Sequence, residues 1–97
     1  MKKYELMYIL KADLDETARK EVMDKLHELL TKNGAKINDV NEKDWGLRDL
    51  AYPIKDETKG YYVVVKFEAE PNATSEFDRR TKINNNVLRF LITVDQE

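Results

Sequence analysis

The stretch from Tyr61 to Glu70 places the tightest constraint on the fold of this chain. It reads Tyr-Tyr-Val-Val-Val-Lys-Phe-Glu-Ala-Glu, and β-branched and aromatic residues of this kind favour extended backbone. Side chains alternate between the two faces of a strand, so Val63 and Val65 point to one face and Val64 to the other. Because apolar groups occupy both faces, we expect this strand to lie at the centre of a sheet, covered on both sides.

Three further segments are predicted to be extended. In Lys3–Leu10, apolar side chains again occupy both faces, which predicts a second central strand. Val87–Val94 alternates regularly and is expected to close the chain as the last strand. Another extended run begins at Ala35, and the polar residues of Asn38–Asp44 predict a bulge or bend within it.

The first helix is predicted between the first two strands. Asp13 or Asp15 can cap its start, and apolar residues then recur at three- and four-residue spacing until Asn33 and Gly34 stop it. Acidic and basic side chains alternate on its outer face. This pattern is typical of a solvated surface rather than of a binding site.

A second, shorter helix is predicted over Glu76–Ile83. Asn72, Thr74 or Ser75 can cap it, since each has a short side chain that accepts a hydrogen bond from the first turn. Its apolar periodicity is weak, because Thr81 stands where an aliphatic side chain would pack better.

The segment Trp45–Ile54 reads Trp-Gly-Leu-Arg-Asp-Leu-Ala-Tyr-Pro-Ile and carries the only tryptophan of the chain. Pro53 cannot donate a ladder hydrogen bond, so we expect this segment at an edge of the sheet. One of its faces combines the cation of Arg48 with aliphatic groups and the ring of Tyr52. An edge with this mixed chemistry is suited to binding a partner. Lys55–Gly60, which follows, has the composition of a turn or a flexible loop.

The predicted order is therefore strand, helix, strand, strand, helix, strand. It matches the ferredoxin-like split βαβ arrangement (βαββαβ), an α+β fold in which a four-stranded antiparallel sheet carries two helices on one face. We expect residues 1–97 to form a single domain, since a chain of this length can bury one core. The other face of the sheet stays open, and small folds of this kind commonly bind something on that face or at the sheet edges.

Composition limits the possible functions. The chain has 17 Lys and Arg against 19 Asp and Glu, a net charge of −2, whereas a protein that binds nucleic acid alone usually has a strong positive excess. It has no cysteine and one histidine, so we expect no metal and no cofactor. No apolar run approaches the roughly 20 residues that a membrane span needs, which predicts a soluble, intracellular protein without a targeting segment.

Several distinctive short motifs are spread along essentially the whole chain. They are Lys3-Tyr4-Glu5, Asn33-Gly34-Ala35, Gly46-Leu47-Arg48, Leu50-Ala51-Tyr52-Pro53-Ile54, Lys59-Gly60-Tyr61-Tyr62, Phe77-Asp78-Arg79, Lys82-Ile83 and Asn86-Val87-Leu88-Arg89. With these motifs the chain resembles the bacterial small-subunit ribosomal protein S-six (S6) family. The resemblance implies a non-enzymatic component of the cytoplasmic 30S subunit that pairs with small-subunit ribosomal protein S-eighteen (S18). It also implies binding to 16S rRNA in the platform, in support of 30S assembly and translation.

The candidate rRNA-binding residues are basic side chains near the first strand, the second helix and the last strand. They are Lys2, Lys3, Arg79, Arg80, Lys82 and Arg89. The first and last strands are neighbours in a ferredoxin-like sheet, so we expect Lys2, Lys3 and Arg89 to converge. Arg79 and Arg80 have an alternative role, because both can pair with Glu76 or Asp78 on a solvated helix.

The candidate partner-binding residues come from the proline-containing edge segment and from the strand after it. They are Trp45, Leu47, Arg48, Leu50, Tyr52 and Tyr62. Relatives often carry two consecutive basic residues ahead of Leu-Ala-Tyr, whereas here Arg48 is followed by Asp49. A partner that binds this segment has to tolerate the reversed charge.

Two other classes of function are possible for a chain of this kind. An enzyme would need a nucleophile or a general base, but no serine or cysteine nucleophile pattern accompanies His27, so a surface or boundary histidine is favoured. A homo-oligomeric ferredoxin-like module with a ligand-sensing or regulatory role would use the same open sheet face. Met7, Ile9, Val64 and Leu91, which are expected on that face, are compatible with such self-pairing.

Overall fold

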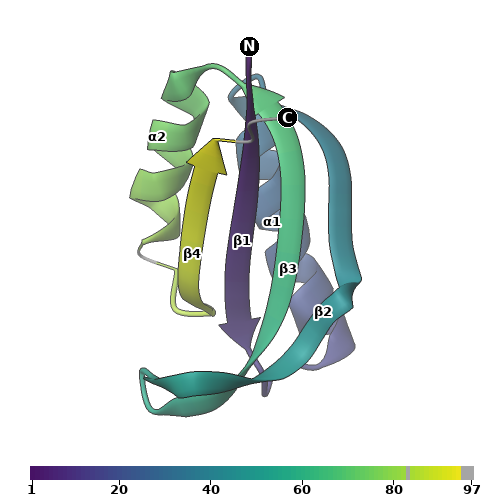
Figure 1. Cartoon of the computed structure of the whole chain (residues 1–97), viewed down its shortest axis with the longest axis vertical. Helices are drawn as coiled ribbons and strands as arrows, with labels where there is room; N and C mark the ends of the chain where they lie inside the picture. The colour runs from purple at the N-terminus through teal and green to yellow at the C-terminus, as the bar shows by residue number, and fades with distance from the viewer. Residues whose placement is uncertain (83, 95–97) are drawn as a thin grey trace.

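A computed structural model of the chain describes residues 1–82 and 84–94, apart from the side chains of Lys43 and Asp44. Its elements are β1 (Lys2–Lys11), α1 (Glu16–Lys32), β2 (Lys36–Ile54), β3 (Glu57–Ala69), α2 (Pro71–Thr81) and β4 (Val87–Val94) (Figure 1). The strands form one antiparallel sheet in the order β2-β3-β1-β4. The ferredoxin-like prediction is therefore confirmed, with β1 and β3 central and β2 at an edge. Ile83 and residues 95–97 lie outside the described residues.

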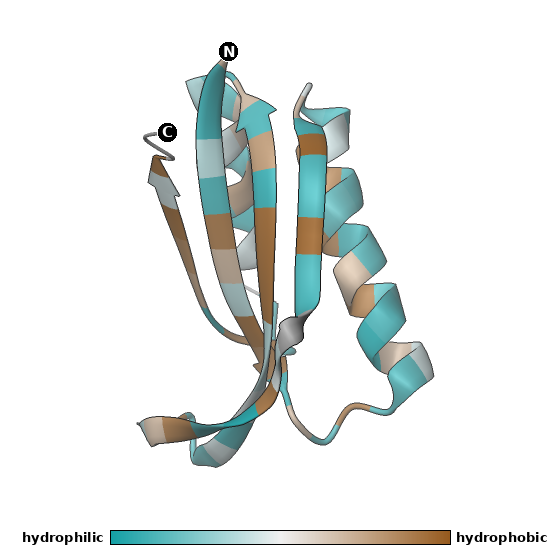
Figure 2. Cartoon of the chain, turned by 45° about the vertical axis from the view of Figure 1, so that its right-hand side comes forward, coloured by the Kyte–Doolittle hydropathy of each residue, from teal (hydrophilic) through white to brown (hydrophobic). Residues whose placement is uncertain are grey.

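The core lies between the sheet and the two helices, which cover the same face (Figure 1). Tyr8, Val63 and Val65 are fully buried there, and side chains from both helices pack against them. Figure 2 shows hydrophobic bands along the central strands, whereas much of α1 is hydrophilic. Within the described part of the chain, neither helix is both long enough and apolar enough to cross a bilayer.

Both ends of α1 form as the sequence predicts. The carboxylate of Asp15 accepts a hydrogen bond from the backbone N–H of Ala18 at 2.7 Å, which satisfies one donor of the first turn. Asn33 is the C-cap, and Gly34 follows at φ +90°, the left-handed conformation that glycine adopts without strain.

The prediction for the second helix was wrong about its start. α2 begins at Pro71 rather than near Glu76, so the three predicted caps, Asn72, Thr74 and Ser75, lie inside the helix. The hydroxyls of Thr74 and Ser75 donate to the Pro71 carbonyl. Proline suits the first helical position, because its φ is already helical and the N–H it lacks would have no partner there.

The turn or flexible loop predicted over Lys55–Gly60 is a turn, but it is shorter than predicted. Only Lys55 and Asp56 form the turn, at φ 50° and 66°, and β3 already starts at Glu57. Positive φ at both central residues is the signature of a tight type I′ hairpin. The far part of this β2–β3 hairpin leaves the plane of the sheet and passes beneath β1 and β4 (Figure 1).

The bend in the hairpin depends on irregular pairing of β2 and on one glycine of β3. The β2–β3 register shifts between Ile37 and Asp39 and again between Asn41 and Gly46, which confirms the predicted bulge. At Gly60 an added Cβ would lie 2.3 Å from Cγ2 of Ile9, far inside van der Waals contact. The missing side chain therefore lets β1 and the base of the hairpin approach closely.

We expect Gly60→Ala to lower the free energy of unfolding by about 1–3 kcal/mol, because the new methyl group would overlap the Ile9 side chain. Urea denaturation measures this loss. The double variant Ile9→Ala/Gly60→Ala should lose less than the sum of the two single variants, since it removes the overlapping atom. Additive losses would show that the contact with Ile9 is not the cause.

We expect Thr81→Val to raise the free energy of unfolding by about 1 kcal/mol. Thr81 is 2% exposed, and its hydroxyl has no hydrogen-bond partner among the described residues. Thr74→Val is the matched control on the same helix, because the Thr74 hydroxyl donates to the Pro71 carbonyl at 2.8 Å. Urea denaturation of both variants should show a gain for Thr81→Val alone.

Candidate functional site

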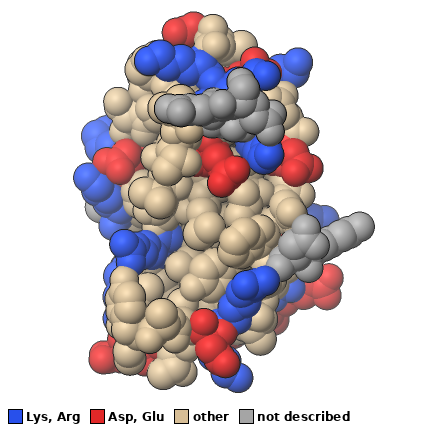
Figure 3. Space-filling model, in the orientation of Figure 1, with Lys and Arg blue, Asp and Glu red and all other residues tan. Residues whose placement is uncertain are grey.

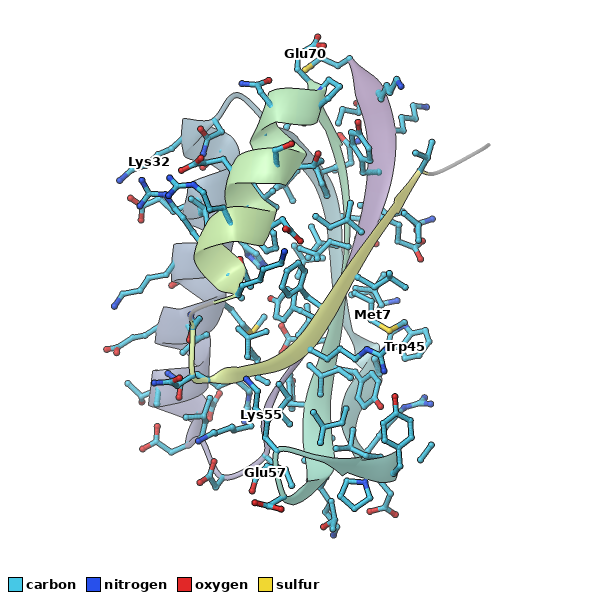
Figure 4. The ribbon with its side chains drawn as sticks, turned by 90° about the vertical axis from the view of Figure 1, so that its left-hand side faces the viewer. Met7, Lys32, Trp45, Lys55, Glu57 and Glu70 are labelled. Atoms are coloured by element: carbon cyan, nitrogen blue, oxygen red, sulfur yellow. The ribbon has the colours of Figure 1, made fainter. Side chains whose placement is uncertain are left out.

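The sheet face without helices carries an uncharged patch bordered by charged side chains (Figure 3). Met7 and Trp45 point to this side of the sheet (Figure 4). The rings of Trp45 and Tyr62 stack at 6.3 Å between centroids, and Leu91 lies directly opposite Met7 with 59% of its surface exposed. Exposed apolar and aromatic groups that gather on one face are typical of an interaction surface.

The aromatic stack continues into the hairpin. The guanidinium carbon of Arg48 lies 5.0 Å from the Trp45 ring centroid, and its Nε donates to the Trp45 carbonyl at 3.1 Å. Leu50 is half-buried and Tyr52 is 57% exposed. Five of the six predicted partner-binding residues, namely Trp45, Arg48, Leu50, Tyr52 and Tyr62, therefore share the open side of the sheet and hairpin.

Leu47 is the exception. It pairs with Tyr61, whose ring packs on the helix side, so Leu47 points away from the open face although it is 58% exposed. Asp49 lies directly opposite Lys59 in the β2–β3 register. Opposite charges at facing positions stabilise an antiparallel pair, so Lys59 offsets the negative charge of Asp49.

The predicted basic residues do not form one cluster. Lys2 and Lys3 pair with the end of β3, whereas Arg89 lies opposite Ile9, six residues further along β1. At about 3.3 Å per residue this separation is about 20 Å. The expected convergence of Lys2, Lys3 and Arg89 was therefore wrong, and the two groups lie at opposite ends of the sheet.

The arginines of α2 are paired within their own helix, as the alternative reading anticipated. Arg79 and Arg80 both donate to the Glu76 carboxylate at 2.6 Å, and Lys82 pairs with Asp78 at 2.8 Å. The hydrogen bonds from Arg79 and then Arg80 lower the pKa of Glu76 to about 2. Two arginines that share one carboxylate leave a net charge of only +1 for an RNA phosphate.

Arg89 has a different kind of partner. Its guanidinium donates a short hydrogen bond to the Tyr52 hydroxyl, and Lys55 at the hairpin tip donates to the Val87 carbonyl at 3.4 Å. Both acceptors are neutral, so the two positive charges are not neutralised. The sequence analysis missed Lys55, because its place beside β4 depends on the curvature of the hairpin and not on any local motif.

The one histidine is half-buried at the boundary of the core, as the sequence predicts. Nε2 of His27 lies 2.9 Å from the hydroxyl of Tyr8, which is fully buried. Burial lowers the pKa of His27, although Asp24 and Glu42 act in the opposite direction. Among the described residues no group of three or more His, Asp or Glu side chains could hold a metal ion. The arrangement is that of a structural contact between α1 and β1.

The fold and this face define a small α+β protein built for binding rather than for chemistry. The family model described as ribosomal protein S6 matches residues 3–93, and the chain belongs to this family. It is similar to the small ribosomal subunit protein bS6 of Halalkalibacterium halodurans, with 46% identity over 100% of both chains. The crystal structure of 30S ribosomal protein S6 from Thermotoga maritima has a TM-score of 0.89 at 22% identity, over 97% of this chain and 87% of that one.

Family membership determines the general role. Ribosomal protein S6 is a structural component of the small ribosomal subunit and not an enzyme. The chain is therefore a ribosome-associated cytoplasmic protein that binds rRNA in the general sense that this role requires. The comparison with the Thermotoga maritima protein, at 22% identity, supports the fold alone.

We expect stability to fall in mild acid because of His27. The folded-state pKa of His27 lies below its ordinary value of 6.5, so its contribution is present above pH 6.5 and is lost as the pH falls through the folded-state pKa. Urea denaturation from pH 7.5 down to about pH 5 should show a steeper loss for the unmodified protein than for His27→Gln. Parallel losses would contradict this assignment.

Proposed function

We propose that this chain binds ribosomal protein S18 through its open sheet face and hairpin, and that the pair binds 16S rRNA in the platform. In this role it supports 30S assembly and translation. The observation that carries the proposal is the uncharged aromatic patch of Trp45, Tyr62, Met7 and Leu91, flanked by the hairpin residues Arg48, Leu50 and Tyr52.

The charge of the chain supports a joint mode of RNA binding. A protein with a net charge of −2 has little long-range attraction for phosphate on its own. A basic partner on the uncharged face would supply the missing charge. The pair would then present one positive surface to a folded RNA junction and would recognise its shape and backbone more than its sequence.

The RNA contacts divide into two groups in this proposal. Lys2 and Lys3 are exposed at one end of the sheet, and Lys82 and Arg89 lie at the other. Arg79 and Arg80 are weaker candidates, because a phosphate has to compete with Glu76 for them. Because the two basic groups lie at opposite ends of the sheet, they suit an RNA whose backbone contacts the protein at both ends.

The test is a binding measurement with S18, first alone and then with the rRNA platform fragment. Leu91→Glu should weaken S18 binding at least about tenfold, because a charge would enter an apolar interface. Val94→Glu is the matched control: Val94 is 54% exposed on the same strand but lies in a hollow with Tyr4 and Thr74 on the helix side. It should bind S18 as the unmodified protein does.

Self-association is the competing outcome. A stable homodimer of the unmodified protein at low concentration, with no binding to S18 or to the platform fragment, would favour the ligand-sensing or regulatory module instead. Equal S18 affinity for Leu91→Glu and Val94→Glu would place the interface away from the open face. Gel filtration and circular dichroism of each variant separate these outcomes from misfolding.

A further inference from the structure

A basic groove of about 320 Å³ lies between the hairpin tip, the end of α2 and the start of β4. Its polar lining includes Lys55, Lys82 and Arg89, together with one carboxylate, that of Asp78. The three cations come from elements that are far apart in the sequence. Figure 4 shows Lys55 reaching toward the start of β4 from the turn of the hairpin. The groove therefore exists only because the hairpin folds back across the sheet.

The partners of these cations leave the groove positively charged. Lys55 donates to the carbonyl of Val87, and Arg89 to the hydroxyl of Tyr52. Neither acceptor carries a charge, so an anion that enters the groove meets Lys55 without displacing a counter-charge. Lys82, in contrast, forms an ion pair with Asp78, with 2.8 Å between Nζ and Oδ2. Lys55, Lys82 and the one carboxylate give the groove a formal charge of +1, which matches the single negative charge of a phosphodiester.

We propose that this groove binds a phosphodiester group of the RNA backbone and that Lys55 is one of its RNA-binding residues. The inference rests on the proposed rRNA binding and deepens it, because it names a residue and a place for one phosphate. The phosphate oxygens accept from Lys55 and Lys82, whereas the Arg89 guanidinium is held by the Tyr52 hydroxyl on the open side of the sheet, beside the groove.

The groove also joins the two binding surfaces. Tyr52 and Lys55 belong to the hairpin that carries the proposed S18 contacts, whereas Arg89 and Val87 belong to β4. A partner that holds the hairpin against β4 keeps the cations in place for the phosphate. S18 binding and RNA binding then favour each other, since linkage between two sites is reciprocal.

The experiment measures the affinity of the complex with S18 for the 16S rRNA platform fragment at several salt concentrations. Lys55→Gln should weaken RNA binding severalfold and reduce the slope of log affinity against log salt by about one. Asp78→Asn should strengthen binding, because it removes the one carboxylate of the groove and releases Lys82. Two variants with opposite effects cannot both result from misfolding.

Lys59→Gln is the matched control. Lys59 is an exposed lysine of the same hairpin, but it pairs with Asp49 outside the groove and should leave both affinity and salt slope almost unchanged. If Lys55→Gln and Lys59→Gln behave alike, or if Asp78→Asn weakens binding, the groove is not a phosphate site. If the unmodified complex with S18 does not bind the fragment at all, the proposed function fails first. Circular dichroism of each variant confirms folding.

Discussion

The uninterrupted pairing of β1 with β3 is the constraint on which the rest of the molecule depends. This register runs from Lys2 opposite Ala69 to Lys11 opposite Gly60 without a shift, whereas the pairings with β2 and β4 both contain shifts. Both strands are apolar on both faces, but two helices cover only one of them. The remaining apolar and aromatic side chains form the open face, so this exposed apolar surface follows from how the central strands are built.

The same pairing determines where the sheet stops and the hairpin begins. At Gly60 the backbone of β3 lies so close to Ile9 that no side chain fits, and beyond this point the hairpin turns across the end of the sheet. Its tip is fastened to β4 by the hydrogen bonds of Lys55 and Tyr52. A steric requirement at one glycine thus helps to bring together the exposed aromatic face and a basic groove from distant parts of the sequence.

What could be predicted from the sequence depends on how local the signal is. The caps of α1 and the alternation of the strands act within a few residues, so both were predicted correctly. Pro71 gave an ambiguous local signal, because proline ends a strand and starts a helix equally well. Lys55 could not be assigned to the groove, since its position depends on the register shifts of β2 and on the close contact at Gly60.

The error over Lys2, Lys3 and Arg89 has a different origin. The prediction that β1 and β4 are neighbours was correct, but neighbouring strands that run antiparallel bring the start of one to the end of the other. Arg89 stands near the start of β4, so strand direction alone separates it from Lys2 and Lys3.

The positive charge that each basic side chain presents to solvent depends on its hydrogen-bond partner, and not only on the number of basic residues nearby. Arg79 and Arg80 are partly neutralised by one carboxylate, whereas Lys55 and Arg89 bond to neutral oxygens and keep their full positive charge.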